Sequence, residues 1–180
     1  MESRSSTHRY KVSLSVLELF NSEVYDLQDT TESKPCKLEL CLDKNGSVEV
    51  KGIVQQRLCT FKDAKHRLAE SLALRVSRNL KLKTRNEQSH CIVRIRVSSV
   101  NIITGTTYRA RLDMVDLAGS EYMKQGSTSS SGHPKIHHIN ESLSSLGDIF
   151  HALATKRARV PFRNDKLTYV LSDSLGKSFA

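Results

Sequence analysis

Tryptophan is absent from this 180-residue chain, and only five phenylalanines and five tyrosines occur. None of these rings is interleaved with the basic clusters, as stacking platforms for single-stranded nucleic acid would be. No apolar run approaches the roughly 18 residues that a membrane-spanning helix requires, and the first residues lack the apolar core of a secretory signal. These absences argue against nucleic-acid and membrane partners and favour a location inside the cell.

Sequence motifs for several kinds of chemistry are also missing. The four cysteines form no C-x-x-C pair and have no zinc-like spacing, so we expect reduced thiols. The histidines between positions 133 and 138 lie in a Ser/Gly-rich stretch without a nearby cysteine, and we expect no metal site. No G-x-S-x-G occurs, and the phosphate-cradling motif G-x-x-x-x-G-K-[ST] is absent too. Gly176-Lys-Ser has only its last three residues, because Leu171 stands where the first glycine is required.

The composition that remains is that of a basic globular domain. Apolar residues make up 38% of the chain, which is enough to bury a core, and the formal net charge is +9. Such a charge predicts attraction to a polyanion, but it does not distinguish nucleic acid, an acidic membrane and an acidic protein surface.

Apolar periodicity predicts strands and helices in mixed order, which is typical of an α/β domain. We expect a strand followed by a short helix over residues 10–27 and a hairpin over 38–50, which turns at Asn45-Gly46. Further on, we expect a helix over 60–80 capped by Thr60, neighbouring strands over 91–100 and 108–115, a flexible Ser/Gly loop over 126–135, and helices over 139–153 and 165–175. In the first of the two neighbouring strands, Arg94 and Arg96 are interpreted as a polar set against Ile92, Ile95 and Val97.

The run LDMVDLAGSE over residues 112–121 carries the strongest chemical signal. An apolar strand that ends in Asp116, followed by a turn at Gly119, is how nucleotide hydrolases place a carboxylate near Mg²⁺ and an N–H near the terminal phosphate. An isolated D-x-x-G is more often a plain Asx-type turn. Here the whole string DLAGSE is similar to the second switch of kinesins.

Other segments support this resemblance in the order in which the family has them. Residues 10–27 resemble the kinesin strand V-S-x-L-E-I-Y-N-E-x-V-x-D-L-L, and residues 38–53 resemble the hairpin that ends in V-x-G-L. INESLSSLG over 139–147 resembles the start of the helix that lies on tubulin. VPFRNDKLT over 160–168 resembles P-Y-R-D-S-K-L-T, and LSDSLG over 171–176 extends that match. The chain therefore resembles the later half of a kinesin motor domain over nearly its whole length.

The resemblance implies an incomplete kinesin-type motor fold of the α/β class. We expect residues 1–180 to form one partial motor domain with a central mixed sheet flanked by helices. The N-terminal strands and the last core strand would be missing, and the phosphate-binding loop would lie upstream of Tyr10. Such an open sheet predicts a broad or weak thermal transition for the isolated chain.

For the nucleotide, the resemblance implies ATP and Mg²⁺ as cofactors and assigns nucleotide-sensing roles to Ser89, His90, Asp116, Gly119 and Glu121. The first-switch pattern N-x-x-S-S-R-S-H falls on residues 83–90, where only the final Ser-His remains. Asn-Glu-Gln occupies the places of S-S-R, so that a negative charge lies near the phosphates and the arginine for an ion pair is lost. Hydrolysis by this chain alone is therefore not expected.

The segments that face microtubules in the family are better kept. The resemblance implies tubulin as the partner, the cytoplasmic microtubule cytoskeleton as the location, and the following contact residues: Asn140, Leu143, Leu146, Gly147, Arg159, Arg163 and Lys166. Asn164 and Asp165 stand where the family has aspartate and serine. A second basic group flanks the first-switch segment and could either face phosphate or be solvated, and we favour the solvated interpretation: Arg75, Arg78, Lys81, Lys83 and Arg85.

Three hypotheses for the function follow. The first is a kinesin-like fragment that binds microtubules without independent catalysis. The second is a truncated form of an active ATP-driven motor. The third is a general polyanion-binding domain, whose DNA affinity would fall steeply with salt and which would show no preference for tubulin.

Overall fold

The computed structural model describes residues 7–30, 36–80, 89–119 and 134–176, with the backbone alone at 78–80 and 134–137. Its main sheet is built around β1 (His8–Phe20), which pairs along nearly its whole length with β7 (His90–Asn101). On the other side of β7 lies β8 (Thr107–Asp116). The second half of β1 also pairs with β2 (Glu23–Asp26), and β2 in turn pairs with β3 (Lys37–Leu38). The first half of β1 pairs with β6 (Gln56–Leu58). Every strand pair among the described residues is antiparallel.

A small second sheet is the predicted hairpin. Its strands β4 (Leu40–Leu42) and β5 (Val48–Val50) meet across a turn in which Gly46 has φ 75°, a conformation that glycine adopts without steric cost. The side chain of Asp43 closes the turn by accepting hydrogen bonds from the backbone N–H groups of Asn45 and Ser47, each at 2.8 Å.

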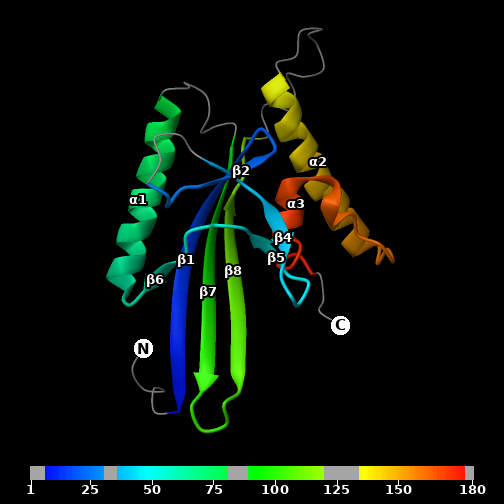
Figure 1. Cartoon of the computed structure of the whole chain (residues 1–180). Coiled ribbons are helices and arrows are strands. Elements are labelled where there is room, and N and C mark those ends of the chain that lie inside the picture. Colours follow the sequence, from blue (N-terminus) through cyan, green and yellow to red (C-terminus); the bar gives the residue numbers. More distant parts are fainter. Residues whose placement is uncertain (1–6, 31–35, 81–88, 120–133, 177–180) are drawn as a thin grey trace.

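Helices cover the sheet on both sides, as Figure 1 shows: α1 (Phe61–Leu80) lies on one side, and α2 (Pro134–Ala154) and α3 (Lys166–Leu171) lie on the other. A short 3₁₀ helix, η3 (Phe162–Asn164), precedes α3. A reciprocal capping box begins α1, because Asp63 N–H donates to Thr60 Oγ1 (3.1 Å) and Asp63 Oδ2 accepts from Thr60 N–H (2.9 Å). This confirms the predicted cap.

The core consists of two clusters, one on each face of β1. Leu17 and Leu19 point to the side of α2 and α3, and Leu14 and Val16 point to the side of α1. Burial on both faces explains why the middle of β1 is apolar without interruption.

The α/β class with helices flanking a sheet is confirmed, as are the hairpin, α1, the neighbouring strands β7 and β8, and α2. The short helix expected before residue 27 is wrong. Asn21 and Ser22 have φ values of 51° and 56°, so the chain turns back at once into β2. The helix expected over 165–175 is shorter and ends at Leu171.

The flexible loop expected over residues 126–135 is wrong at its end, because α2 already begins at Pro134; the rest of it lies outside the described residues. Proline suits the first helical turn, since the N–H that it lacks has no partner there. Within the described part of the chain, no helix has the length and apolarity needed to cross a bilayer.

Candidate functional site

Arg75 is the centre of a hydrogen-bonded cluster at the end of the sheet. Its guanidinium donates from Nη1 to Asp116 Oδ2 (2.8 Å) and from Nη2 to the backbone oxygen of Ser89 (2.8 Å) and to Ser89 Oγ (3.3 Å). Arg75 comes from α1, Ser89 immediately precedes β7, and Asp116 ends β8. One buried cation therefore holds together two of the predicted nucleotide-sensing residues.

His90, the next predicted residue, connects the end of β8 with α2. Its Nδ1 accepts from the backbone N–H of Ala118 (3.0 Å), which places its proton on Nε2, 2.8 Å from Ser142 Oγ. Ser142 Oγ in turn donates to the carbonyl of Ile139 (3.0 Å). Burial lowers the pKa of His90 to about 4, with the positive charge of Arg75 acting in the same direction and Asp116 opposing it. The ring is therefore neutral at pH 7.

Together these contacts form one polar path from α1 through the strand ends to α2. Gly119 lies half-buried directly after Ala118. Glu121, also assigned to this site, lies outside the described residues. Among the described residues that the resemblance assigns to Mg²⁺-ATP, Asp116 is the most accessible. Its side chain is 72% exposed, and Arg75 donates to its Oδ2.

The fit to a nucleotide is partial. Asp116 could hold one water of a bound Mg²⁺ with its free oxygen, whereas the Ser89 hydroxyl already accepts from Arg75. Among the described residues, no three His, Cys, Asp or Glu side chains converge as metal ligands. In the described part of the site, Asp116 is thus the residue that could contact a bound Mg²⁺ through water.

The interpretation of Arg75 as part of a solvated basic face is wrong. Its side chain is 10% exposed. It lies four residues after the buried Ser71 and seven after Leu68, which packs against the core cluster on the α1 side of the sheet, so all three share the stripe of α1 that faces the sheet. That spacing was the signal that could have revealed it. The remaining members of the group, at positions 78–85, have no described side chains.

Three of the predicted microtubule-contact residues meet at a groove of about 620 Å³ between α2, η3 and α3. Asn140, Arg163 and Lys166 line it, together with Asp165 and Tyr169. Asp165 caps α3 by accepting from Leu167 N–H (2.7 Å), and burial raises the pKa of this carboxyl. The substitution of the family's serine by aspartate at this position therefore keeps a capping side chain.

Electrostatics on this surface are partly satisfied within the chain. Lys166 Nζ lies 2.6 Å from Glu23 Oε2, and Lys37 pairs with the other oxygen of Glu23 at 3.3 Å. The hydrogen bond from Lys166 is the main cause of the lowered pKa of Glu23. Arg163 lies 5.7 Å from the ring centroid of Tyr169, which orients its guanidinium by a cation–π contact.

The remaining predicted contact residues lie outside the groove. Gly147 and Arg159 are exposed and Leu143 is half-buried. Leu146 is only 9% exposed and packs into the core with Ile92 and Leu167. The prediction that Leu146 contacts a partner directly is therefore wrong, because its side chain is buried in the core.

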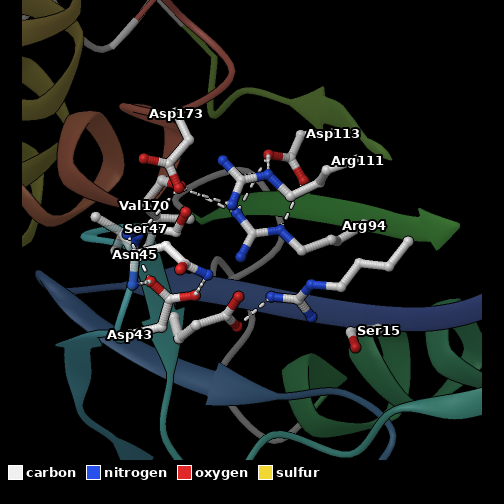
Figure 2. A network of polar contacts seen from close by, with 12 residues as sticks. Ser15, Asp43, Asn45, Ser47, Arg94, Arg111, Asp113, Val170 and Asp173 are labelled. Atoms are coloured by element: carbon white, nitrogen blue, oxygen red, sulfur yellow. Dashed lines mark hydrogen bonds and ion pairs between the residues drawn. The ribbon is translucent and has the colours of Figure 1, made fainter. Parts of the chain in front are cut away.

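A buried charge network, which the sequence did not reveal, ties α3 and the hairpin to the sheet (Figure 2). Arg94 and Asp113 have side chains that are each 1% exposed, and they meet through Nε and Oδ1 at 2.7 Å. Arg94 also donates to the backbone oxygen of Val170 in α3 (3.0 Å). Arg111 lies between the carboxylates of Asp113 (3.2 Å) and Asp173 (3.1 Å), and Asp173 accepts from the N–H of Val48 (3.0 Å).

The interpretation of Arg94 as part of a polar strand face apart from Ile92 is thus wrong. Only Val93 separates them, so they lie on the same, buried face of β7. Asp113 makes this burial tolerable because it balances the charge and accepts two of the guanidinium's hydrogen bonds.

Comparison with known proteins places this architecture among kinesins. The family model described as the kinesin motor domain matches residues 1–179. The chain is 37% identical over 175 residues to the rice kinesin-like protein KIN-14E and 35% identical over 176 residues to the Arabidopsis thaliana kinesin-like protein KIN-14S. These matches cover 97% of this chain but 16% and 23% of the two relatives. The chain thus spans less than a quarter of their length.

Solved structures show the same likeness. A fast kinesin, whose description refers to its ATPase mechanism and its interactions with microtubules, matches with a TM-score of 0.81 and 28% identity over 94% of this chain and 48% of its own. The C-terminal motor and motor homology domain of Kar3Vik1 matches with a TM-score of 0.77 and 30% identity, covering 44% of that chain.

Proposed function

Because the chain belongs to the kinesin motor domain family, we propose that it is a microtubule-binding portion of a motor domain with little or no ATP turnover of its own. The observation that carries this proposal is the groove between α2 and α3, where Asn140, Arg163 and Lys166 meet on one surface. The similar fast kinesin is described as interacting with microtubules. The corresponding location is the microtubule cytoskeleton.

The charge around this groove supports an acidic partner. The loop between α2 and η3 carries exposed Lys156, Arg157 and Arg159, and Arg163 follows in η3. Lys166 forms an ion pair with Glu23, which Lys37 also contacts, so Lys166 contributes less than the other cations to the attraction of an acidic partner. A dense set of exposed cations mainly speeds association and confers specificity for a surface of opposite charge.

Weak or absent ATP turnover is proposed on the chemistry of the residues present. The 180 residues contain no G-x-x-x-x-G-K-[ST] motif, and Glu87 and Gln88 replace the serine and arginine of the first switch. Asp116 is held by Arg75 through Oδ2, and its Oδ1 has no hydrogen-bond partner among the residues that the structure describes. The alternative, a portion of an active motor, makes a different prediction for hydrolysis.

The microtubule surface is tested by charge reversal. We expect the purified chain to co-pellet with microtubules, and we expect the double variant Arg159→Glu/Arg163→Glu to lose about tenfold in affinity at about 0.1 M salt, because two exposed cations become repulsive. The measurement is sedimentation with taxol-stabilised microtubules across a salt series.

The matched control is Lys62→Glu/Lys65→Glu, which changes the net charge equally on exposed positions of α1, across the sheet from the groove. We expect this variant to lose less than threefold, a screened long-range effect. Equal losses of affinity in both variants would indicate general polyanion binding. The same conclusion would follow if DNA displaced the chain from microtubules as effectively as unlabelled microtubules do.

Steady-state phosphate release tests the catalytic half of the proposal. We expect a rate at background for the chain alone and no increase on addition of microtubules. Heat-denatured chain sets the background, and a complete kinesin motor domain serves as the positive control. Microtubule-stimulated hydrolysis that Asp116→Ala abolishes would contradict the proposal and favour an active motor.

A further inference from the structure

Polar side chains form rows across β1, β7 and β8 on the face that carries α3 and the hairpin. Residues directly opposite each other in antiparallel strands point to the same face, so the strand registers define these rows. The row at the open end of the sheet is Arg9–Val100–Thr107, which has an apolar residue in β7. Further inward lie three polar rows: an outer row, Lys11–Ser98–Arg109, and two inner rows, Ser13–Arg96–Arg111 and Ser15–Arg94–Asp113.

The two inner rows are neutralised within the chain. Arg94 pairs with Asp113, and Arg111 pairs with both Asp113 and Asp173 (Figure 2). Arg96 forms an ion pair with Glu49, which reaches down from β5. Each of these carboxylates is therefore engaged by an arginine.

The outer row differs because it has two cations and no acid of its own. Lys11 and Arg109 are exposed, and neither has an ion-pair partner among the residues that the structure describes. Ser98 lies between them. Asp43 is the acid across from Arg109. Its Oδ1 accepts from the backbone N–H groups of Asn45 and Ser47, and its Oδ2 accepts from the side-chain amide of Asn45 at 3.4 Å. The hydrogen bond from Ser47 is the main cause of the lowered pKa of Asp43, and the charge of Arg109 contributes least.

This row forms one end of a groove of about 1010 Å³, which the hairpin β4–β5 and the turn after α3, at Asp173 and Ser174, bound on the other sides. The groove is far larger than one small anion. It shares no lining residue with the groove between α2 and α3.

We propose that this groove binds an acidic peptide segment, with carboxylates on Lys11 and Arg109 and a hydrogen bond to Ser98. Strands in a sheet are about 4.8 Å apart, so the backbones of the two cations are about 10 Å apart, and alternate side chains of an extended peptide lie about 7 Å apart on one face. The flexible stems of lysine and arginine bridge that difference. The unbalanced outer row selects for negative charge, and the size of the groove selects for a chain rather than an ion.

The test uses the full chain and a fluorescein-labelled decaglutamate peptide, followed by anisotropy. We expect saturable binding that Lys11→Gln/Arg109→Gln weakens about fivefold to tenfold, as expected for two exposed ion pairs. Ser98→Ala should weaken it about twofold. Circular dichroism checks that the variants remain folded, which we expect because both cations are exposed.

Lys62→Gln/Lys65→Gln is the matched control, since it removes the same charge from α1, and we expect a loss of less than twofold. Decaglutamine should not bind. Equal losses in both double variants, absence of decaglutamate binding, or tripolyphosphate competing at the same concentration as the peptide would each overturn the proposal. Because the two grooves share no residue, loss of microtubule binding in the Arg159/Arg163 variant should leave decaglutamate binding unchanged.

Discussion

Replacing Asp113 by leucine is expected to lower the free energy of unfolding by about 3–5 kcal/mol, which is the usual cost of leaving one member of a buried ion pair without its partner. Arg94 is 1% exposed and would lose both hydrogen bonds that Asp113 accepts from it. Val170 O would be its remaining described acceptor. Arg111 would keep its contact with Asp173, so the loss should be concentrated on Arg94. Urea denaturation followed by circular dichroism measures the effect.

The double variant Arg94→Met/Asp113→Leu separates loss of the pair from loss of packing. Because apolar residues of similar volume often replace a buried ion pair without loss, we expect the double variant to recover most of the stability. Asp148→Leu, at an exposed position of α2, is the control and should change the free energy of unfolding by less than about 0.5 kcal/mol. A double variant as unstable as Asp113→Leu would mean that the charges themselves hold α3 and the hairpin in place.

Acidification is expected to destabilise the fold through His90. The pKa of this ring is about 4 in the folded chain and about 6.5 when unfolded, so between these values the unfolded state binds more protons. Stability therefore rises with pH in this window: the contribution is fully present above pH 6.5 and is lost as the pH falls towards 4. A difference of this size corresponds to about 3 kcal/mol. Urea denaturation at closely spaced pH values measures the slope.

His90→Gln provides the comparison, because it removes the titrating group and keeps an amide that can both donate and accept. We expect it to be less stable at pH 7 and to show a flatter profile between pH 6.5 and 4.5. Subtracting the two profiles removes the carboxylates that titrate in both proteins. Arg75 and Asp116 act on His90 with opposite signs, so Arg75→Met should raise the pKa of His90 and shift the loss of stability to higher pH. Parallel profiles for the chain and His90→Gln would show that another group controls the pH dependence.

Local patterns predicted those parts of the fold that depend on neighbours in sequence. The hairpin at Gly46 and the Thr60 cap of α1 follow from residue types a few positions apart. The helix expected before residue 27 failed because the dense apolar residues of β1 are buried on both faces, a pattern that periodicity alone cannot separate from a buried helix.

For the site, the resemblance to the two kinesin switch patterns pointed to Ser89, His90 and Asp116, and the structure brings them together. Their connections were not predictable from the sequence. Ser142 is 52 positions from His90, and Asp113 is 19 from Arg94, so each pair meets only through tertiary packing or strand register. Charged residues were interpreted as solvated, and this assumption failed wherever a partner of opposite charge was present in the core.

The imidazole of His90 is a rigid plate with both nitrogens occupied, one by Ala118 and the other by Ser142. A hydrogen bond tolerates a change in length of only about 0.5 Å before it is lost. If the segment after β8 moved further than this, either Ser142 and the part of α2 around it would move with it or a buried nitrogen would be left unpaired. The ring would therefore act as a spacer of fixed length between the segment after β8 and α2, the helix that lines the groove between α2 and α3.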